Sequence, residues 1–347
     1  MIIKEGLSYD DVLLEPTYSE IGSRSEVDLS VTIFKTDSNI FKFTNPLISA
    51  NMSTVTAYDM AETFFKMGAM AIVHRFMSIE DQVDLATTLQ RRNVGNPMNF
   101  VGFSIGVQES DKLHAQQLVD AGVRIICIDV AHGDSKLSVD MCRYISGTYP
   151  DILLIAGNVA TAPGAVRLWE AGADIVKAGV GPGSLCSTRI ETGNGVPQLT
   201  ALMDIALFRG EAQRRLGRPL YFIADGGIKN SGDATKALAL ADMVMVGSLL
   251  AGTDEAPGEE MDIDGQKYKR YDGSSTLKTN HIEGVTALIP SRGPVRTVIT
   301  KLLQGISSGC SYQGSYNLTE LKDNPVFIKI TNAGLAESRP HNSHTIK

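Results

Sequence analysis

Eight short apolar runs rich in β-branched residues recur along the sequence, and each precedes a turn and a helix-length amphipathic stretch. This alternation is typical of βα units built around parallel strands. Eight evenly spaced units favour a closed (β/α)₈ TIM barrel, with a doubly wound sheet as the alternative. The runs are PLISA (46–50), AMAIVHR (69–75), FVGFSIG (100–106), RIICIDV (124–130), ILLIAGN (152–158), ADIVKAG (173–179), YFIADGG (221–227) and ADMVMVG (241–247).

The composition is that of an ordinary globular protein with enough apolar residues for a large core. The 347 residues are 43% hydrophobic and 20% charged, so one large domain or two smaller ones would fit. The formal net charge of −7 argues against a nucleic-acid partner, because binding to a phosphate backbone normally requires a basic surface. We therefore expect any bound phosphate to be small and held locally.

The cysteines indicate free thiols rather than disulfides or a metal site. They lie far apart and show no metal-ligand spacing. The sequence shows no signal peptide and no apolar run of about 18 residues. We therefore expect a cytoplasmic protein without a membrane partner. The cysteines are Cys127, Cys142, Cys186 and Cys310.

Polar residues gather where the predicted strands end. In a TIM barrel the chemistry lies at these carboxyl ends, so the clustering favours a functional site there. The residues concerned are Asn51, His74, Arg75, Asp129, His132, Asn158, Cys186, Asp225, Gly247 and Ser248.

The loop AGVGPGSLCSTRIETGNGVPQ, residues 178–198, presents a candidate nucleophile. Gly181 and Gly183 allow a tight backbone and Pro182 fixes one φ angle, so Cys186 can be presented at the end of a strand. The thiolate is the attacking species, which requires a lowered pKa or a neighbouring base. A lone cysteine is more often structural, and the loop alone leaves both interpretations open.

Two consecutive loops, 225–228 and 247–250, follow the seventh and eighth predicted strands, where TIM barrels commonly bind phosphate. The backbone N–H groups of these loops could hold a phosphate dianion. The alternative is that the glycines only turn the chain. The sequence has no early GxGxxG motif and no P-loop, so a nucleotide would be bound in another way. The candidate phosphate ligands are Gly226, Gly227, Gly247 and Ser248.

The barrel pattern stops after the eighth run, and residues 252–295 form an insertion. Its segment MDIDGQKYKRY predicts a hairpin with a turn at Asp264 and Gly265. Residues 272–284 are polar and would form a lid over the strand ends, or else an ordinary surface loop. A helix is expected at 295–303. The tail from 333 to 347 is expected to be loose or to contact another subunit.

Several motifs together resemble the IMP dehydrogenase/GMP reductase family over nearly the whole chain. SRSE (23–26), ANMST (50–54), VHRF (73–76), IDVAHG (128–133) and YDGSS followed by HIEG (271–284) resemble the bacterial GMP reductases in particular. SLLAGTDEAPGE and AGLAES are as similar to IMP dehydrogenases. The motifs that carry the family resemblance are GPGSLCSTR (181–189), ADGGI (224–228), GSLLAG (247–252), SYDDVLLEP (8–16) and AGNVAT (156–161).

The resemblance implies a single catalytic barrel over residues 1–347, without the CBS domains that IMP dehydrogenases usually carry and without their longer flap with its Arg-Tyr pair. It implies NADPH-dependent reductive deamination of GMP to IMP and ammonia through a covalent bond to Cys186. Thr188 and Glu283 would protonate the departing ammonia. The alternatives are an IMP dehydrogenase with a shortened flap, a reductase of a modified or deoxy guanine nucleotide, and a catalytically silent nucleotide-binding barrel.

The resemblance also implies the binding residues and a homotetramer. Asp225 would accept hydrogen bonds from the ribose, and Gly273 and Ser275 would recognise the purine edge. Two positions depart from the usual family pattern: Ser53 replaces Asp, and Arg75 replaces the Lys of dehydrogenases. The remaining implied residues are Ser184, Gly226, Gly227, Gly247, Ser248 and Tyr271 for the phosphate; Arg75, Asp129, His132 and Asn158 for the cofactor; and the backbone carbonyls of Gly181, Gly183 and Cys186 for a K⁺ ion.

Overall fold

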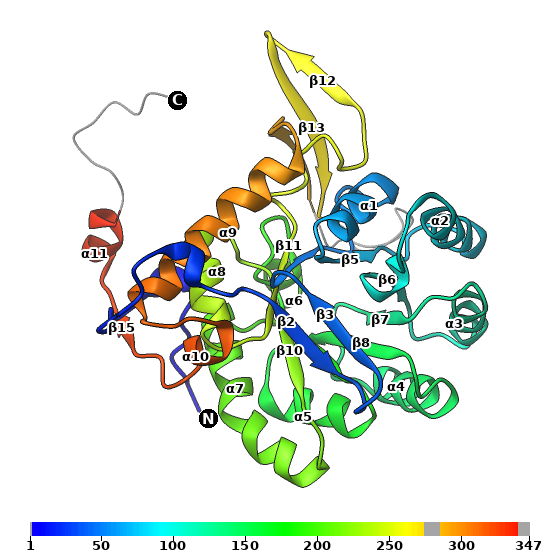
Figure 1. The fold of residues 1–347 in the computed structure, drawn as a ribbon, viewed down its shortest axis with the longest axis horizontal. Coiled ribbons are helices and arrows are strands. Elements are labelled where there is room, and N and C mark those ends of the chain that lie inside the picture. The colour runs from blue at the N-terminus through cyan, green and yellow to red at the C-terminus, as the bar shows by residue number, and fades with distance from the viewer. Residues whose placement is uncertain (1, 274–284, 339–347) are drawn as a thin grey trace.

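The barrel expected from the sequence is present in the computed structural model, which describes residues 2–273 and 285–338. Eight parallel strands close into a barrel in the order β10-β11-β4-β5-β6-β7-β8-β9 (Figure 1). Each predicted run supplies one strand, so the TIM-barrel prediction is confirmed and the doubly wound alternative is wrong. The barrel strands are β4 (Leu47–Ser49), β5 (Met70–Val73), β6 (Val101–Ile105), β7 (Ile125–Asp129), β8 (Leu153–Val159), β9 (Ile175–Ala178), β10 (Tyr221–Asp225) and β11 (Met243–Val246).

Local capping sets where the outer helices begin and end. The side chains of Ser78, Thr161 and Asn230 each accept a hydrogen bond from the backbone N–H three residues later. Gly217 ends the longest of these helices at a φ of 65°, a left-handed conformation that glycine adopts without a steric penalty. The helices are α1 (Tyr58–Lys66), α2 (Ile79–Arg92), α3 (Ser110–Asp120), α4 (Lys136–Thr148), α5 (Ala162–Glu170), α7 (Gln198–Leu216), α8 (Ser231–Leu238) and α9 (Val295–Tyr312).

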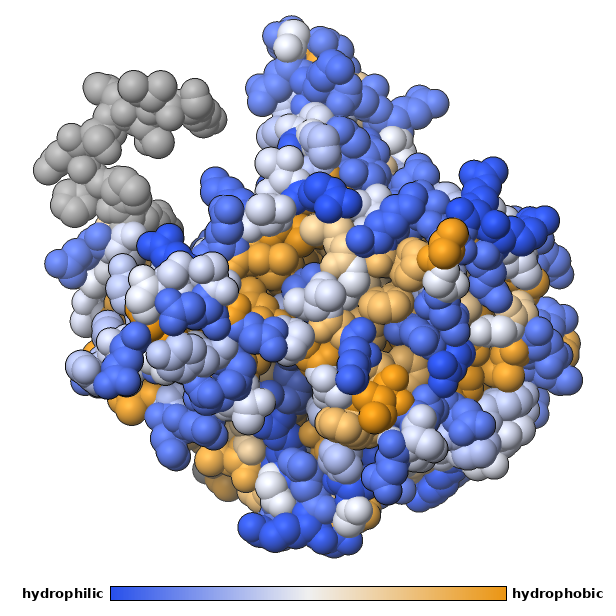
Figure 2. All heavy atoms as spheres, in the orientation of Figure 1, coloured by the Kyte–Doolittle hydropathy of each residue, from blue (hydrophilic) through white to orange (hydrophobic). Residues whose placement is uncertain are grey.

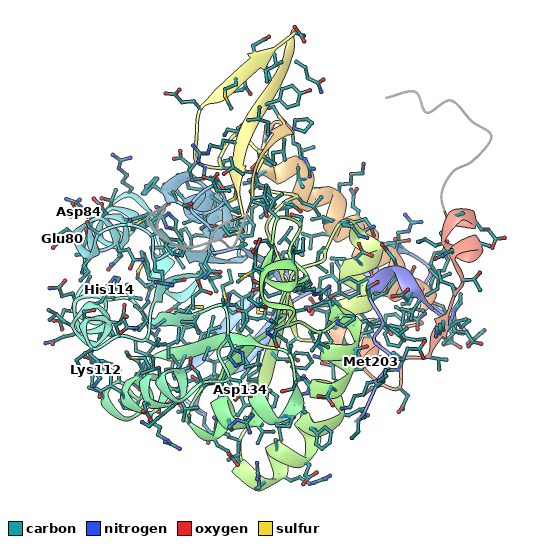
Figure 3. All side chains as sticks on the ribbon, turned by 180° about the vertical axis from the view of Figure 1, so that it is seen from behind. Glu80, Asp84, Lys112, His114, Asp134 and Met203 are labelled. Atoms are coloured by element: carbon teal, nitrogen blue, oxygen red, sulfur yellow. The ribbon has the colours of Figure 1, made fainter. Side chains whose placement is uncertain are left out.

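The outer helices are amphipathic, whereas the barrel strands are buried on both faces. Glu80 and Asp84 of α2 lie on the outside of the molecule (Figure 3), while His114 of α3 is buried with its Nε2 2.8 Å from Gln82 Oε1. All residues of β5, β9 and β11 are buried. Because both faces of such parallel strands are buried, their sequences are continuous apolar runs. Lys177 in β9 is a charged exception.

The N-terminal segment covers the amino ends of the barrel strands, an arrangement that the sequence did not predict. Strands β2 (Val31–Phe34) and β3 (Ile40–Phe43) form an antiparallel hairpin across this end (Figure 1). The backbone N–H of Phe34 donates to the hydroxyl of Tyr221 at the start of β10. The remaining elements near the termini are η1 (Tyr9–Asp11), β1 (Val12–Leu14), η2 (Arg24–Glu26), η3 (Pro97–Asn99), α10 (Leu318–Leu321), β15 (Phe327–Lys329) and α11 (Asn332–Glu337), with β1 pairing antiparallel with β15.

The insertion after β11 contains the expected hairpin and one further strand. Strands β12 (Glu260–Ile263) and β13 (Gln266–Asp272) meet at a turn in which Asp264 and Gly265 both have positive φ. Strand β14 (Thr286–Pro290) pairs with β13 and was not predicted. The hairpin projects from the barrel and its surface is mostly hydrophilic (Figures 1 and 2). The expected lid falls largely on residues 274–284, which lie outside the described residues.

Helix α9 and the C-terminal segment differ from the expectation. The helix predicted at 295–303 extends to Tyr312, because apolar positions continue at helical spacing with Ile306 and Cys310 buried. The segment from 333, expected to be loose or to contact another subunit, begins within helix α11, which Thr331 caps by accepting a hydrogen bond from the N–H of Gly334.

Asp174 and Asp242 join neighbouring barrel strands near their amino ends through the same kind of hydrogen bond. Asp174 precedes β9 and accepts a hydrogen bond from the N–H of Leu154, and Asp242 precedes β11 and accepts one from the N–H of Phe222. Asp242 is also paired with Arg209 at 2.9 Å and Lys322 at 2.6 Å. Burial would raise the pKa of Asp242, but the two cations hold this pKa below its ordinary value.

We expect the substitution Asp242→Asn to lower the free energy of unfolding by about 3 kcal/mol at pH 7, because it leaves two cations without their buried partner. The folded-state pKa of Asp242 is lowered, so its contribution is complete above the ordinary pKa of about 4 and is lost as the pH falls through the folded-state value. Urea denaturation at several pH values tests this. A difference between the two proteins that stays constant down to about pH 2 would contradict the assignment.

Candidate active site

A cavity of about 180 Å³ opens at the carboxyl ends of the barrel strands. Its wall combines the loop after β9 with the ends of β7, β8 and β10 and with β13, so segments far apart in the sequence meet here. Most of the residues predicted for the site line this cavity. They are Arg75, Asp129, Asn158, Gly181, Gly183, Ser184, Cys186, Thr188, Asp225, Gly226, Tyr271 and Gly273.

A second cavity of about 200 Å³ adjoins the first, and the two share Pro182 and Ser184. Gly227 and Ser248 line this second cavity, together with the basic residues Arg189 and Lys229. The residues predicted to bind phosphate are therefore divided between two neighbouring cavities. A ligand that passes Ser184 would contact both.

Among the described residues predicted for the site, Gly247, His74 and His132 line neither cavity. Gly247 lies close by, because a methyl group on its Cα would be 3.4 Å from the hydroxyl of Tyr271. His132 is exposed and lies outside both linings, since the chain turns outward after β7. Glu283 and Ser275 lie in the segment 274–284, outside the described residues.

Cys186 is chemically distinct from the other cysteines. Its thiol is half-buried in the first cavity and donates to Thr188 Oγ1 at 3.2 Å. Burial raises the pKa of the other three thiols, Cys127, Cys142 and Cys310, to about 12, so these remain protonated and inert. The position of Cys186 therefore favours the nucleophile interpretation over the structural one.

Glycine permits the close packing around the Cys186 loop. Gly181 has a φ of 85° and packs against the side chain of Arg189. The carbonyl of Gly183 accepts a hydrogen bond from the N–H of Cys186 at 3.1 Å. Short helix α6 (Thr188–Thr192) then begins after Ser187, which is its N-cap and follows the cysteine. The K⁺ site stays a prediction that rests on backbone carbonyls; no cluster of three His, Cys, Asp or Glu side chains suited to a metal occurs in residues 2–273 and 285–338.

A buried lysine, which sequence reasoning missed, joins the two aspartates of the cavity. Lys177 Nζ lies 2.9 Å from Asp129 Oδ1 and 3.1 Å from Asp225 Oδ2. Burial would lower the pKa of Lys177, but the two carboxylates outweigh this and raise it. Burial would likewise raise the pKa of Asp129, which Lys177 instead lowers. The sequence signal was a lysine within an otherwise apolar strand.

Two of the residues predicted for the cofactor, Asn158 and Arg75, support these aspartates. Asn158 Nδ2 donates to Asp225 Oδ2 at 2.8 Å and to the carbonyl of Gly179 at 2.9 Å. Arg75 Nε donates to the carbonyl of Asp129 at 3.0 Å. Asn158, which was predicted to bind the cofactor, therefore contacts Asp225, the residue predicted to bind the ribose.

The insertion after β11 contributes Tyr271 and Gly273 to the cavity wall. Tyr271 is buried, which raises its pKa, and its hydroxyl lies 3.5 Å from Ser184 Oγ. Gly273 packs so closely on Leu185 that an added methyl group would lie 2.3 Å from the Cβ of that residue. The N–H of Val285 donates to the carbonyl of Leu185. The base of the predicted lid is therefore attached to the Cys186 loop.

His74 is a structural residue despite its place at a strand end. It is buried, which lowers its pKa to about 4, so the imidazole is neutral. Its Nδ1 accepts a hydrogen bond from the N–H of Phe76, and its carbonyl accepts one from Gln82.

No helix in the described part of the chain is long and apolar enough to cross a membrane.

Comparisons with known proteins agree with the geometry at the level of the family. The model of the IMP dehydrogenase / GMP reductase domain matches residues 6–341. An inosine-5′-monophosphate dehydrogenase of Nitrosopumilus maritimus is 32% identical, with 98% of this chain and 99% of the relative aligned. One of Staphylococcus aureus is 33% identical, with 99% and 97% aligned. These relatives carry the name of the dehydrogenase, so the comparisons support the alternative prediction better than the specific assignment to GMP reductase. The chain belongs to the IMP dehydrogenase/GMP reductase family.

Proposed function

We propose that the protein catalyses a redox reaction at C2 of a purine nucleoside 5′-monophosphate through a covalent bond to Cys186. The observation that carries this proposal is the position of Cys186. It is the half-buried thiol of the chain, and it faces the same cavity as Asp225. Covalent catalysis would divide a difficult displacement into two easier steps.

The two neighbouring cavities, which share Pro182 and Ser184, support a position for the nucleotide. The purine would sit over Cys186 and the ribose against Asp225. The phosphate would pass Ser184 toward Gly227 and Ser248 in the second cavity. Backbone N–H groups of glycine loops suit a small anion, which agrees with the acidic net charge of the chain.

The family is one of oxidoreductases, and a nicotinamide cofactor would supply or accept the hydride at C2. Arg75 and Asp129 would hold it, because both line the cavity of Cys186. The guanidinium of Arg75 cannot shuttle a proton as an ammonium can. Its role is therefore limited to positioning.

Oxidation of IMP is the direction that the named relatives favour. The Cys186 sulfur would bond to C2, the hydride would leave C2 for NAD⁺, and water would then hydrolyse the thioimidate. This last step requires a base. Lys177 is a cation and the pKa of Asp129 is lowered, so neither is suited to deprotonate water near neutral pH. The base would have to come from another group, such as Glu283.

Reduction of GMP is the direction that the insertion sequence favours. Residues 273–285 contain no arginine or tyrosine, so the Arg-Tyr pair that dehydrogenases usually carry has no counterpart there. The Cys186 sulfur would bond to C2, ammonia would leave as Thr188 and Glu283 supply its proton, and hydride from NADPH would release IMP and the thiolate. A deoxy or modified guanine nucleotide would undergo the same steps.

One assay separates the two directions. The purified protein is mixed with IMP and NAD⁺ in one series and with GMP and NADPH in another, and the nicotinamide absorbance is followed. Formation of NADH in the first series alone identifies a dehydrogenase, and loss of NADPH in the second alone identifies a reductase. Activity in neither series, with all four nicotinamide cofactor forms tried, would overturn the proposal.

We expect Asp225→Ala to raise KM for the nucleotide by about tenfold or more, with a smaller effect on kcat. Contacts to the ribose are made in the ground state and the transition state alike, so their loss is uniform. Steady-state kinetics in the active direction measures both constants. An unchanged KM would place Asp225 outside the nucleotide site.

A further inference from the structure

The ammonium group of Lys177 uses its hydrogen-bonding capacity within the protein. An ammonium has three protons to donate. Lys177 Nζ donates to Asp129 Oδ1 at 2.9 Å, Asp225 Oδ2 at 3.1 Å and Asn51 Oδ1 at 3.5 Å. Asn51 is itself held by a 3.0 Å hydrogen bond from its Nδ2 to Ser104 Oγ. Lys177 is therefore fixed and has no proton left for a ligand.

Packing alone gives no reason for a charge at this position. The Lys177 side chain is only 3% exposed, and the other residues of β9 are apolar. Burying an ion pair often costs as much as it returns, and an apolar residue of similar size is commonly as stable. We therefore look for the role of the Lys177 charge in its two partners, the carboxylates of Asp129 and Asp225, which line the cavity.

The hydrogen bonds on Asp225 are arranged asymmetrically. Its Oδ2 accepts from both Lys177 and Asn158. Among the described residues, the structure shows no donor to the other oxygen, Oδ1. Two donors on one oxygen fix the rotation of the carboxylate, and Asp225 lines the cavity, so Oδ1 is the oxygen left to accept from a ligand.

We propose that Lys177 is a positioning residue that, together with Asn158, fixes the carboxylate of Asp225 so that its free oxygen accepts the ribose hydroxyls. The proposal rests on the proposed function only in taking the ligand to be a nucleoside monophosphate. Lys177 lines the cavity, but it donates its protons to Asn51, Asp129 and Asp225, so it would act on the ligand through Asp225. Its loss should therefore weaken recognition of the sugar rather than of the base or phosphate.

The test compares two nucleotides in one set of variants. Isothermal titration calorimetry gives the Kd of IMP and of 2′,3′-dideoxy-IMP, which lacks the hydroxyls. The variant Lys177→Met removes the charge at similar length. Lys35→Met is the matched control, because Lys35 is partly buried, with 10% of its side chain exposed, and ion-paired at 2.8 Å to Asp174, but at the opposite end of the barrel. Thermal unfolding records the stability of each variant.

We expect wild-type protein to bind IMP at least tenfold more tightly than the dideoxy analogue, and Lys177→Met to reduce this ratio to below about threefold. Lys35→Met should lower Tm and keep the ratio. If Lys177→Met does not fold, Lys177→Met/Asp129→Asn removes one unpaired carboxylate and is judged by the same ratio. A wild-type ratio retained in either folded Lys177 variant overturns the inference and leaves the proposed function intact. Failure of the wild type to bind IMP or GMP overturns the proposed function itself.

Discussion

Replacing Cys186 by alanine is expected to abolish turnover while leaving nucleotide affinity within a few-fold of wild type. The thiol forms the covalent bond, whereas contacts to the phosphate and ribose supply most of the ground-state affinity. Loss of a covalent route should lower kcat by at least about 10⁴-fold, which corresponds to about 5.4 kcal/mol of barrier. Cys186 is suited to this role because it lines the cavity and its sulfur lies 3.2 Å from Thr188 Oγ1.

The measurement combines steady-state turnover with calorimetric binding of the nucleotide. Cys310→Ala is the control, since Cys310 is fully buried in α9 and its thiol has a pKa of about 12. This control should lose some stability and keep its kcat. Turnover by Cys186→Ala above about a tenth of the wild-type rate would remove Cys186 from the role of nucleophile.

The barrel was predictable because its signal is local. Each strand is a short apolar run, buried on its outer face by the flanking helices and on its inner face by the side chains of the barrel interior. The hairpin formed by β2 and β3 was not predictable in this way. Its strands alternate buried and exposed residues over only four positions, and their place is set by contacts with distant residues such as Tyr221.

The candidate site was predictable where it depends on strand ends. Cys186, Asp225 and Asn158 all follow or end a strand, and the fold brings them to one cavity. The ion-pair partners of Lys177 could not be predicted from the sequence, because they lie 48 residues away in either direction. His132 is exposed and lines neither cavity, and its cofactor role stays a prediction. It follows a strand end within a family motif, yet the loop carries it outward into solvent.

Replacing Gly179 by alanine is expected to have the largest effect on folding. Gly179 directly follows β9 and has a φ of 149°, a conformation that residues with a side chain rarely adopt. An added methyl group would lie 2.1 Å from the carbonyl oxygen of Asp225, so one of the two backbones must move. The combined strain and displacement should lower the free energy of unfolding by more than about 3 kcal/mol.

The displacement falls where the nucleotide site is assembled. Gln198 Nε2 donates to the carbonyls of Ala178 and Asp225 and so joins the ends of β9 and β10 beside Gly179. The carbonyl of Gly179 also accepts from Asn158, which holds the Asp225 carboxylate. Any Gly179→Ala protein that folds should therefore bind IMP and GMP more weakly as well as unfold at lower urea concentration.

A second glycine provides the matched control. Gly210 lies within α7, and nothing lies within 4 Å of the position that an added methyl group would occupy. Gly210→Ala should raise the free energy of unfolding by about 0.5 to 1 kcal/mol, because alanine loses less backbone entropy in a helix. Urea denaturation of both variants without ligand should therefore show changes of opposite sign in the free energy of unfolding. Equal small shifts would show that the ends of β9 and β10 tolerate a side chain at position 179, and that the close approach of these two strand ends does not determine the geometry of Asp225.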